Sequence, residues 1–287
     1  MRKLLIIFVI IILAGTAAYG EEAALVPEGN LRLSFIQNPG FAGKDLLVNW
    51  KLGAEYATAD WLNLQLLWNP RLRPDLCSGS LYFGIKNYIM GDGALVPVAA
   101  QWLRLSAALG ILIPPPDPQP TLRDQDQMLW GSALRLYSDF LINRYFYINL
   151  FFEGDFYPPQ RADSDVFQGE LVRHYLDLTG ELELNFETPL ANGIVLKYGA
   201  PVRFFYAPYM NASDEYAGSQ YCLSTGAYVG LKPPEGEPPM EIYFRYNAHL
   251  LGQNMKQAHY ISFILRVTLP PDALKLRAKD KDKEGTL

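Results

Sequence analysis

Residues 175–187 read YLDLTGELELNFE, and their side chains alternate between two kinds. One set is apolar and contains Leu176, Leu178, Leu182, Leu184 and Phe186. The other set is polar and carries the carboxylates of Asp177, Glu181 and Glu183. Successive side chains of a β-strand point to opposite faces of the sheet. The stretch therefore predicts a strand with one apolar face and one charged face.

The same alternation recurs in about twelve segments, a pattern typical of a transmembrane β-barrel. Many of these segments exceed the usual five or six residues and approach the roughly nine to eleven that cross a bilayer at a tilt. We expect an all-β, antiparallel, up-and-down barrel of about twelve strands. The expected strands cover residues 30–37, 45–56, 60–68, 80–90, 99–112, 128–141, 145–156, 175–187, 193–206, 221–231, 240–250 and 259–269.

The connections support this topology. Those after even-numbered strands tend to be short (57–59, 142–144 and 188–192), and those after odd-numbered strands are mostly longer (69–79, 113–127, 157–174 and 207–220). Outer-membrane barrels have short periplasmic turns and longer outside loops. Prolines gather in the connections because proline cannot donate to the ladder, but Pro201 lies inside an expected strand, where we predict a bulge or a kink.

The N-terminus resembles an export signal. Arg2 and Lys3 precede an apolar run at residues 4–13, and small residues follow at 18–20. Residues 1–20 therefore predict a cleaved signal peptide. Residues 21–269 are expected to form one barrel domain that starts with a short leader at 21–29, and residues 270–287 a charged, solvated tail.

Composition limits the classes of function. Without Arg2 and Lys3, 23 basic and 30 acidic residues remain, a formal net charge of −7, so no basic nucleic-acid footprint is present. The mean hydropathy of −0.01 is compatible with a barrel, which needs only every second strand residue to be apolar. The two cysteines and three histidines form no metal-binding pattern. We expect no metal, no cofactor and no catalytic residue.

The inward face carries charged side chains in mid-strand. A charge is costly in hydrocarbon or in a dry core without a partner, so the interior must be watery or internally paired. Candidate lumen and selectivity residues are Lys51, Glu55, Lys86, Arg104, Arg135, Asp139, Glu153, Asp155, Asp177, Glu181, Glu183, Lys197, Arg203, Glu241, Arg245 and Arg266, with Arg32 and Asp45 on the same face.

This pattern resembles bacterial outer-membrane β-barrels, and in strand number the small porins of about twelve strands. The resemblance covers residues 30–269 as a pattern of spacing and carries over no functional residue. It implies residence in the outer-membrane bilayer, insertion by the barrel-assembly machinery, and passive diffusion of small hydrophilic solutes by a monomer or weak homo-oligomer. One departure is the last strand, 260–269, which lacks the terminal aromatic residue that such barrels present for assembly.

Two interpretations of the interior charges stay open. Expected strands seven and eight supply an acidic wall, and the basic residues lie on the others, so a transverse field could orient polar solutes. Alternatively, the charges pair into a network that fills the lumen, because a twelve-stranded barrel lies between filled and open sizes. Nine inward charges of each sign predict weak net ion selectivity.

Cys77 and Cys222 offer a further hypothesis. In this topology Cys77 lies in the outside loop 69–79, and Cys222 points inward at the outside end of its strand. A disulfide between them would draw the loop over the mouth of the barrel. The alternative is two free thiols.

Other classes remain as alternatives. A surface barrel with a filled lumen would use loops 157–174 and 207–220 for adhesion. An outer-membrane hydrolase would need a nucleophile and a base at the rim, where Ser164 and His174 are the candidates, but no triad spacing is present. A soluble β-sandwich also alternates. We expect a channel and not an enzyme.

Overall fold

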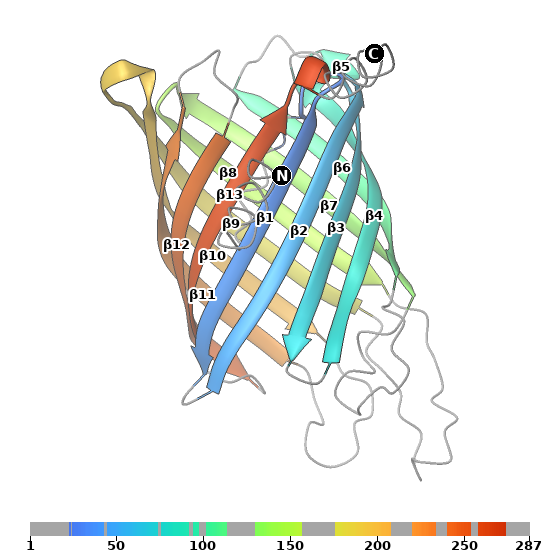
Figure 1. Cartoon of the computed structure of the whole chain (residues 1–287), viewed down its shortest axis with the longest axis vertical. Coiled ribbons are helices and arrows are strands. Elements are labelled where there is room, and N and C mark those ends of the chain that lie inside the picture. The colour runs from blue at the N-terminus through green and yellow to red at the C-terminus, as the bar shows by residue number, and fades with distance from the viewer. Residues whose placement is uncertain are drawn as a thin grey trace, which may run out of the picture.

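The structure, a computed structural model, describes residues 23, 25–42, 45–73, 76–91, 94–97, 102–113, 130–156, 176–207, 220–233, 240–253 and 258–273. In this part of the chain, twelve long antiparallel strands close into a single barrel (Figure 1). The closing contact joins the first strand to the last, with Leu31 opposite Leu269. The soluble sandwich alternative is therefore wrong, because there is one closed sheet and not two packed sheets.

The long strands follow one another around the barrel in chain order. They are β1 (Leu31–Ala42), β2 (Asp45–Ala59), β3 (Leu62–Arg73), β4 (Leu76–Gly91), β6 (Leu103–Ile113), β7 (Gly131–Asn143), β8 (Phe146–Phe156), β9 (Leu176–Pro189), β10 (Val195–Ala207), β11 (Gln220–Lys232), β12 (Met240–Gln253) and β13 (His259–Leu269). A two-residue strand, β5 (Val96–Pro97), pairs in parallel with the end of β4.

The alternation along the strands separates two faces, as predicted. Leu109 on β6 and Phe244 on β12 are 67% and 54% exposed on the outer surface. Arg135 on β7 and Glu181 on β9 are 3% and 5% exposed in the interior. An apolar outside and a polar inside are the arrangement of a transmembrane barrel. None of the described helices is long and apolar enough to cross a membrane.

Inward tyrosines lie over glycines and fill part of the interior. A Cβ added to Gly110 would come within 2.2 Å of the Tyr82 ring, and one added to Gly230 within 2.1 Å of the Tyr243 ring. These approaches are shorter than van der Waals contact, so both positions require glycine while the rings stay in place. Placing an aromatic side chain over a glycine also covers the exposed backbone of the sheet.

The loop expected at 69–79 is wrong. β3 continues to Arg73 and β4 begins at Leu76, with those two residues opposite each other, so only two residues join the strands. A loop was expected here because one expected strand ended at residue 68 and the next began at residue 80. Backbone pairing continues because a strand that extends beyond the hydrocarbon layer needs no apolar side chains.

Pro201 does not produce the expected bulge. Gly199 pairs with Tyr228 and Val202 pairs with Thr225, so the register between β10 and β11 is the same on both sides of the proline. Ala200 and Pro201, which lie between those pairs, form no ladder pair with β11. The Thr225 hydroxyl donates to the Pro201 carbonyl at 2.9 Å and replaces part of the lost backbone bonding.

The barrel sheet begins and finishes at the same end of the barrel, because Leu31 at the start of β1 pairs with Leu269 at the end of β13. The turns at 60–61, 144–145 and 190–194 lie at this end, which we call the turn end; the last includes a short 3₁₀ helix, η2 (Ala191–Gly193). The connections at 114–130, 157–175 and 208–219 join strands at the opposite end. Two connections at that end, 43–44 and 74–75, have only two residues, and the connections at 92–102 and 233–239 on the turn end are longer than the turns beside them. The expected difference in connection length therefore holds for only part of the barrel.

Candidate functional site: the barrel lumen

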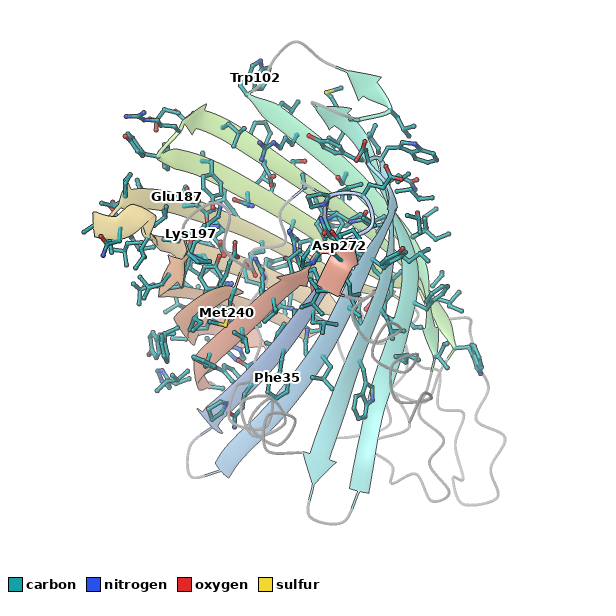
Figure 2. The ribbon with its side chains drawn as sticks, turned by 45° about the horizontal axis from the view of Figure 1, so that its top comes forward. Phe35, Trp102, Glu187, Lys197, Met240 and Asp272 are labelled. Atoms are coloured by element: carbon teal, nitrogen blue, oxygen red, sulfur yellow. The ribbon has the colours of Figure 1, made fainter. Side chains whose placement is uncertain are left out.

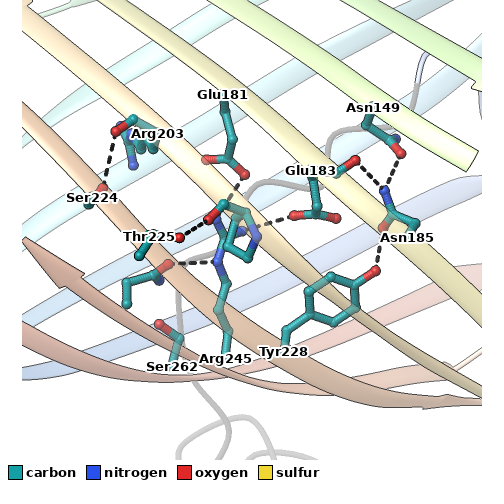
Figure 3. A network of polar contacts seen from close by, with 12 residues as sticks. Asn149, Glu181, Glu183, Asn185, Arg203, Ser224, Thr225, Tyr228, Arg245 and Ser262 are labelled. Carbon is teal, nitrogen blue, oxygen red and sulfur yellow. Dashed lines mark hydrogen bonds and ion pairs between the residues drawn. The ribbon is translucent and has the colours of Figure 1, made fainter.

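One arginine connects strands on different parts of the interior wall. Arg245 on β12 donates to Glu181 at 2.9 Å and to Glu183 at 3.2 Å, and both carboxylates are on β9 (Figure 3). A third bond, at 3.0 Å, runs to the side-chain oxygen of Asn247. Arg245 is 4% exposed and the two carboxylates are 5% exposed each, so this part of the lumen is filled. The predicted acidic and basic walls meet here in direct contact.

Other predicted lumen charges form four further groups of ion pairs. Each joins a cation and a carboxylate that face the interior, at distances between 2.5 and 3.8 Å. The pairs are Arg32 and Lys86 with Glu55, Arg135 with Glu153, Lys197 with Glu187, and Arg266 with Glu241.

Four of these cations, Lys86, Arg135, Lys197 and Arg266, also lie over tyrosine rings, and the first two make the closest contacts. The Arg135 guanidinium lies 3.7 Å from the centroid of the Tyr82 ring, and the Lys86 ammonium lies 4.3 Å from that of the Tyr137 ring. A cation over an aromatic face gains electrostatic stabilisation, and the ring covers the aliphatic stem. In the described part of the interior, cations, tyrosine rings and carboxylates therefore pack against one another.

A row of neutral and charged groups crosses several strands just below the turn end. The Tyr228 hydroxyl on β11 donates to Asn185 on β9, which donates to Asn149 on β8 at 2.5 Å (Figure 3). Asn149 in turn donates to the carboxylate of Asp139 on β7 at 3.1 Å. We call these four residues the polar row. All four are buried.

The polar row ends on the leader, which enters the barrel. The Ala23 N–H lies 2.9 and 3.0 Å from the two carboxylate oxygens of Asp139, and the Ser106 hydroxyl donates to the Ala23 carbonyl. Ala23 is fully buried and packs with Tyr137 and Phe151. Val26 is fully buried as well. The leader therefore occupies part of the lumen, held at residues more than 80 positions away in sequence.

Other predicted lumen residues lie on the expected strands in less closed arrangements. Asp155 on β8 faces Asp177 on β9 across the ladder, and Arg104 on β6 faces Asp139 on β7. Lys51 and Arg203 are near enough to Glu153 for electrostatic attraction. In the part of the chain that the structure describes, no group of three or more His, Cys, Asp or Glu side chains is arranged to hold a metal.

The cysteine hypothesis is also corrected. Residue 77 belongs to β4 and not to a loop, because it pairs with Leu72 of β3. Cys222 is a buried free thiol on β11. Its inward position agrees with the sequence phase, but a bond that draws a loop over the mouth does not exist in this structure. The Cys77 side chain, together with Ser164 and His174 of the hydrolase alternative, lies outside the described residues.

Sequence reasoning missed several of these residues. Glu187 is the partner of Lys197, and Tyr228, Asn185 and Asn149 make the polar row, yet only mid-strand charges were selected as candidates. Neutral amides at the inward phase of a charged strand were the available signal. For the leader, the signal was the apolar run AALV at 23–26, which lies between Glu22 and Pro27.

A closed antiparallel barrel with an apolar outside and a polar inside is the fold of bacterial outer-membrane β-barrels. An outer-membrane channel from Pseudomonas putida F1 has this fold with a TM-score of 0.57 and 10% identity, and the match covers 88% of this chain and 100% of that one. The β-domain of a Bordetella autotransporter matches with a TM-score of 0.46 and 12% identity over 84% and 99% of the two chains. No protein-family model and no curated protein matches the chain.

Proposed function

We propose that this protein is an outer-membrane channel for the passive diffusion of small hydrophilic solutes. The single observation that carries the proposal is the contrast between the two faces: charged side chains line the interior of a closed barrel, and apolar side chains cover its outside. Such an interior gives polar solutes partners that hydrocarbon lacks. The barrel from Pseudomonas putida is named as a channel, which supports the same class of function.

The outer membrane is the compartment that fits this proposal. The exposed apolar surface needs a lipid bilayer as its partner, and the residues expected as a cleaved signal peptide provide the export route. Insertion would use the barrel-assembly machinery, and the barrel would work as a monomer or weak homo-oligomer. Diffusion down a gradient requires neither a cofactor nor a catalytic step, so we propose no enzymatic activity.

The leader adds a constraint on conduction. Ala23 and Val26 are fully buried inside the barrel, and the Arg245 bridge fills the lumen between β9 and β12. We propose that the leader restricts the conduit in this state and that its displacement widens it.

The same contacts favour a second candidate, a structural or adhesive surface barrel. A lumen closed by ion pairs and by the leader would serve such a protein without conducting anything. Its partner-binding segments would be the long connections at 157–175 and 208–219.

Single-channel recording of the refolded mature protein in a planar bilayer separates the two candidates. The channel proposal expects stepwise, reproducible currents, with larger steps when residues 21–26 are deleted. Proper insertion is checked independently by protease protection of the barrel. A folded, inserted barrel that is silent with and without the leader would exclude the channel and leave the adhesive candidate.

A further inference from the structure

A cavity of about 610 Å³ lies at the turn end of the barrel. Figure 2, turned so that this end comes forward, shows Glu187 and Lys197 near each other and Trp102 at the rim. The volume falls within the roughly 300–1,000 Å³ that is usual for small-molecule sites. Its lining consists of Trp102, Leu103, Arg104, Asp139, Leu141, Asn143, Arg144, Tyr147, Glu187, Lys197 and Lys232.

The two carboxylates of the lining are already engaged by the protein. Asp139 accepts the Ala23 N–H and the amide of Asn149. Glu187 lies 3.6 Å from the Lys197 ammonium and 3.4 Å from the Tyr147 hydroxyl. Neither acid therefore serves as a binding group for a solute cation without giving up these partners.

The cations of the lining outnumber its acids. The lining contains four cations, and only one of them, Lys197, is bound to a carboxylate, that of Glu187. Within the described part of the chain, Arg104, Arg144 and Lys232 form no ion pair. Arg104 is half-buried, and its backbone is opposite that of Asp139 in the ladder. A concave site whose unpaired charges share one sign concentrates ions of the opposite sign.

We infer that the turn-end cavity is a binding site for a small organic acid that carries one or two carboxylate or phosphate groups. A guanidinium presents parallel N–H donors that match either group, and this suits Arg104 as the principal anchor. Lys232 and Arg144 add positive charge toward the rim. The Tyr147 ring and Leu141 supply less polar surface for the rest of the solute.

This inference names the solute class for the proposed channel and rests on that function only for its biological use. The two are distinguishable, because equilibrium binding needs no conduction. A silent barrel that binds the acid keeps the site and loses the channel. A conducting barrel that fails to bind it keeps the channel and loses the site.

Isothermal titration calorimetry on the full mature chain in detergent micelles tests the site. Succinate and inorganic phosphate are the probes, and succinamide is the uncharged counterpart of succinate. We expect saturable binding of succinate, of phosphate or of both, no binding of succinamide, and weaker binding as salt screens the charges. Which probe binds more tightly assigns carboxylate or phosphate as the recognised group.

Variants identify the residues that bind. Arg104→Gln is expected to weaken binding at least about tenfold, because it removes a hydrogen-bond donor of full charge. Arg32→Gln makes the same change at another half-buried lumen arginine whose partner, Glu55, retains Lys86, so it should bind as the wild type does. Lys232→Gln is a second test at the rim, with a smaller loss. The inference is overturned if neither probe binds the folded wild type, or if Arg104→Gln and Lys232→Gln both bind like Arg32→Gln.

Discussion

Arg245 shows how much a single interior side chain determines. It is buried, and it neutralises two carboxylates on a strand that is not its neighbour in the barrel. Desolvating three charges is costly, and the cost is offset only while the geometry and the remaining hydrogen bonds are kept. The alternation placed all three residues on the inward face from sequence, but it gave no information about which charges would meet across the interior.

Arg245→Met should therefore destabilise the barrel by about 3–5 kcal/mol, because two buried carboxylates lose their common partner. Arg266→Met is the matched control, since the Arg266 and Glu241 side chains are more exposed, at 16% and 18%, and lie 3.7 Å apart. Its loss should be clearly smaller, because a longer contact between more exposed side chains is better screened by water. Urea unfolding in lipid vesicles, followed by tryptophan fluorescence, measures both. Adding Glu181→Gln and Glu183→Gln to Arg245→Met should recover much of the loss, and equal losses in the two single variants would contradict the argument.

At the scale of elements, the alternation of apolar and polar side chains predicted the strands, because each face of a strand meets a different medium along its whole length. The ends of β3 and β4 were missed because backbone pairing outside the bilayer does not depend on side-chain polarity. The leader was missed for another reason. The leader has no alternating pattern of side chains. Its position depends on contacts with Asp139 and Ser106, which come together only in the closed barrel.

The contact between the leader and Asp139 makes a prediction for this element. Asp139→Ala removes the acceptor of the Ala23 N–H, and losing a hydrogen bond to a charged group costs about 1.5–3 kcal/mol. The leader should then leave the lumen more often, and its amide hydrogens should exchange about tenfold faster or more. Mass spectrometry of peptic peptides from the leader measures this exchange.

A charge control is available in the turn between β2 and β3. Asp60→Ala removes the same charge from a residue that is exposed and outside the lumen, so it should leave leader exchange unchanged. Exchange in the strands should be the same in both variants. Equal protection of the leader in Asp139→Ala and in the wild type would show that Asp139 does not hold it.

For the whole molecule, the balance of charge predicts how ions pass. The sequence places nine inward charges of each sign, and the structure pairs many of them, so most of the lumen has little net field for a monovalent ion. The exception is the turn-end cavity, where cations outnumber carboxylates. A barrel of this kind should discriminate weakly between potassium and chloride, with a small preference for chloride that originates at one end.

The reversal potential in a potassium chloride gradient measures this preference. Arg104→Gln should abolish the preference for chloride, and Arg32→Gln should reduce it less, because Arg32 faces a carboxylate that keeps a second cation. Because the excess of cations lies at one end of the barrel, succinate added on the turn-end side should reduce the current more than succinate added on the other side. A strong preference for either ion, or equal block from both sides, would mean that the paired interior and not the turn-end cavity controls permeation.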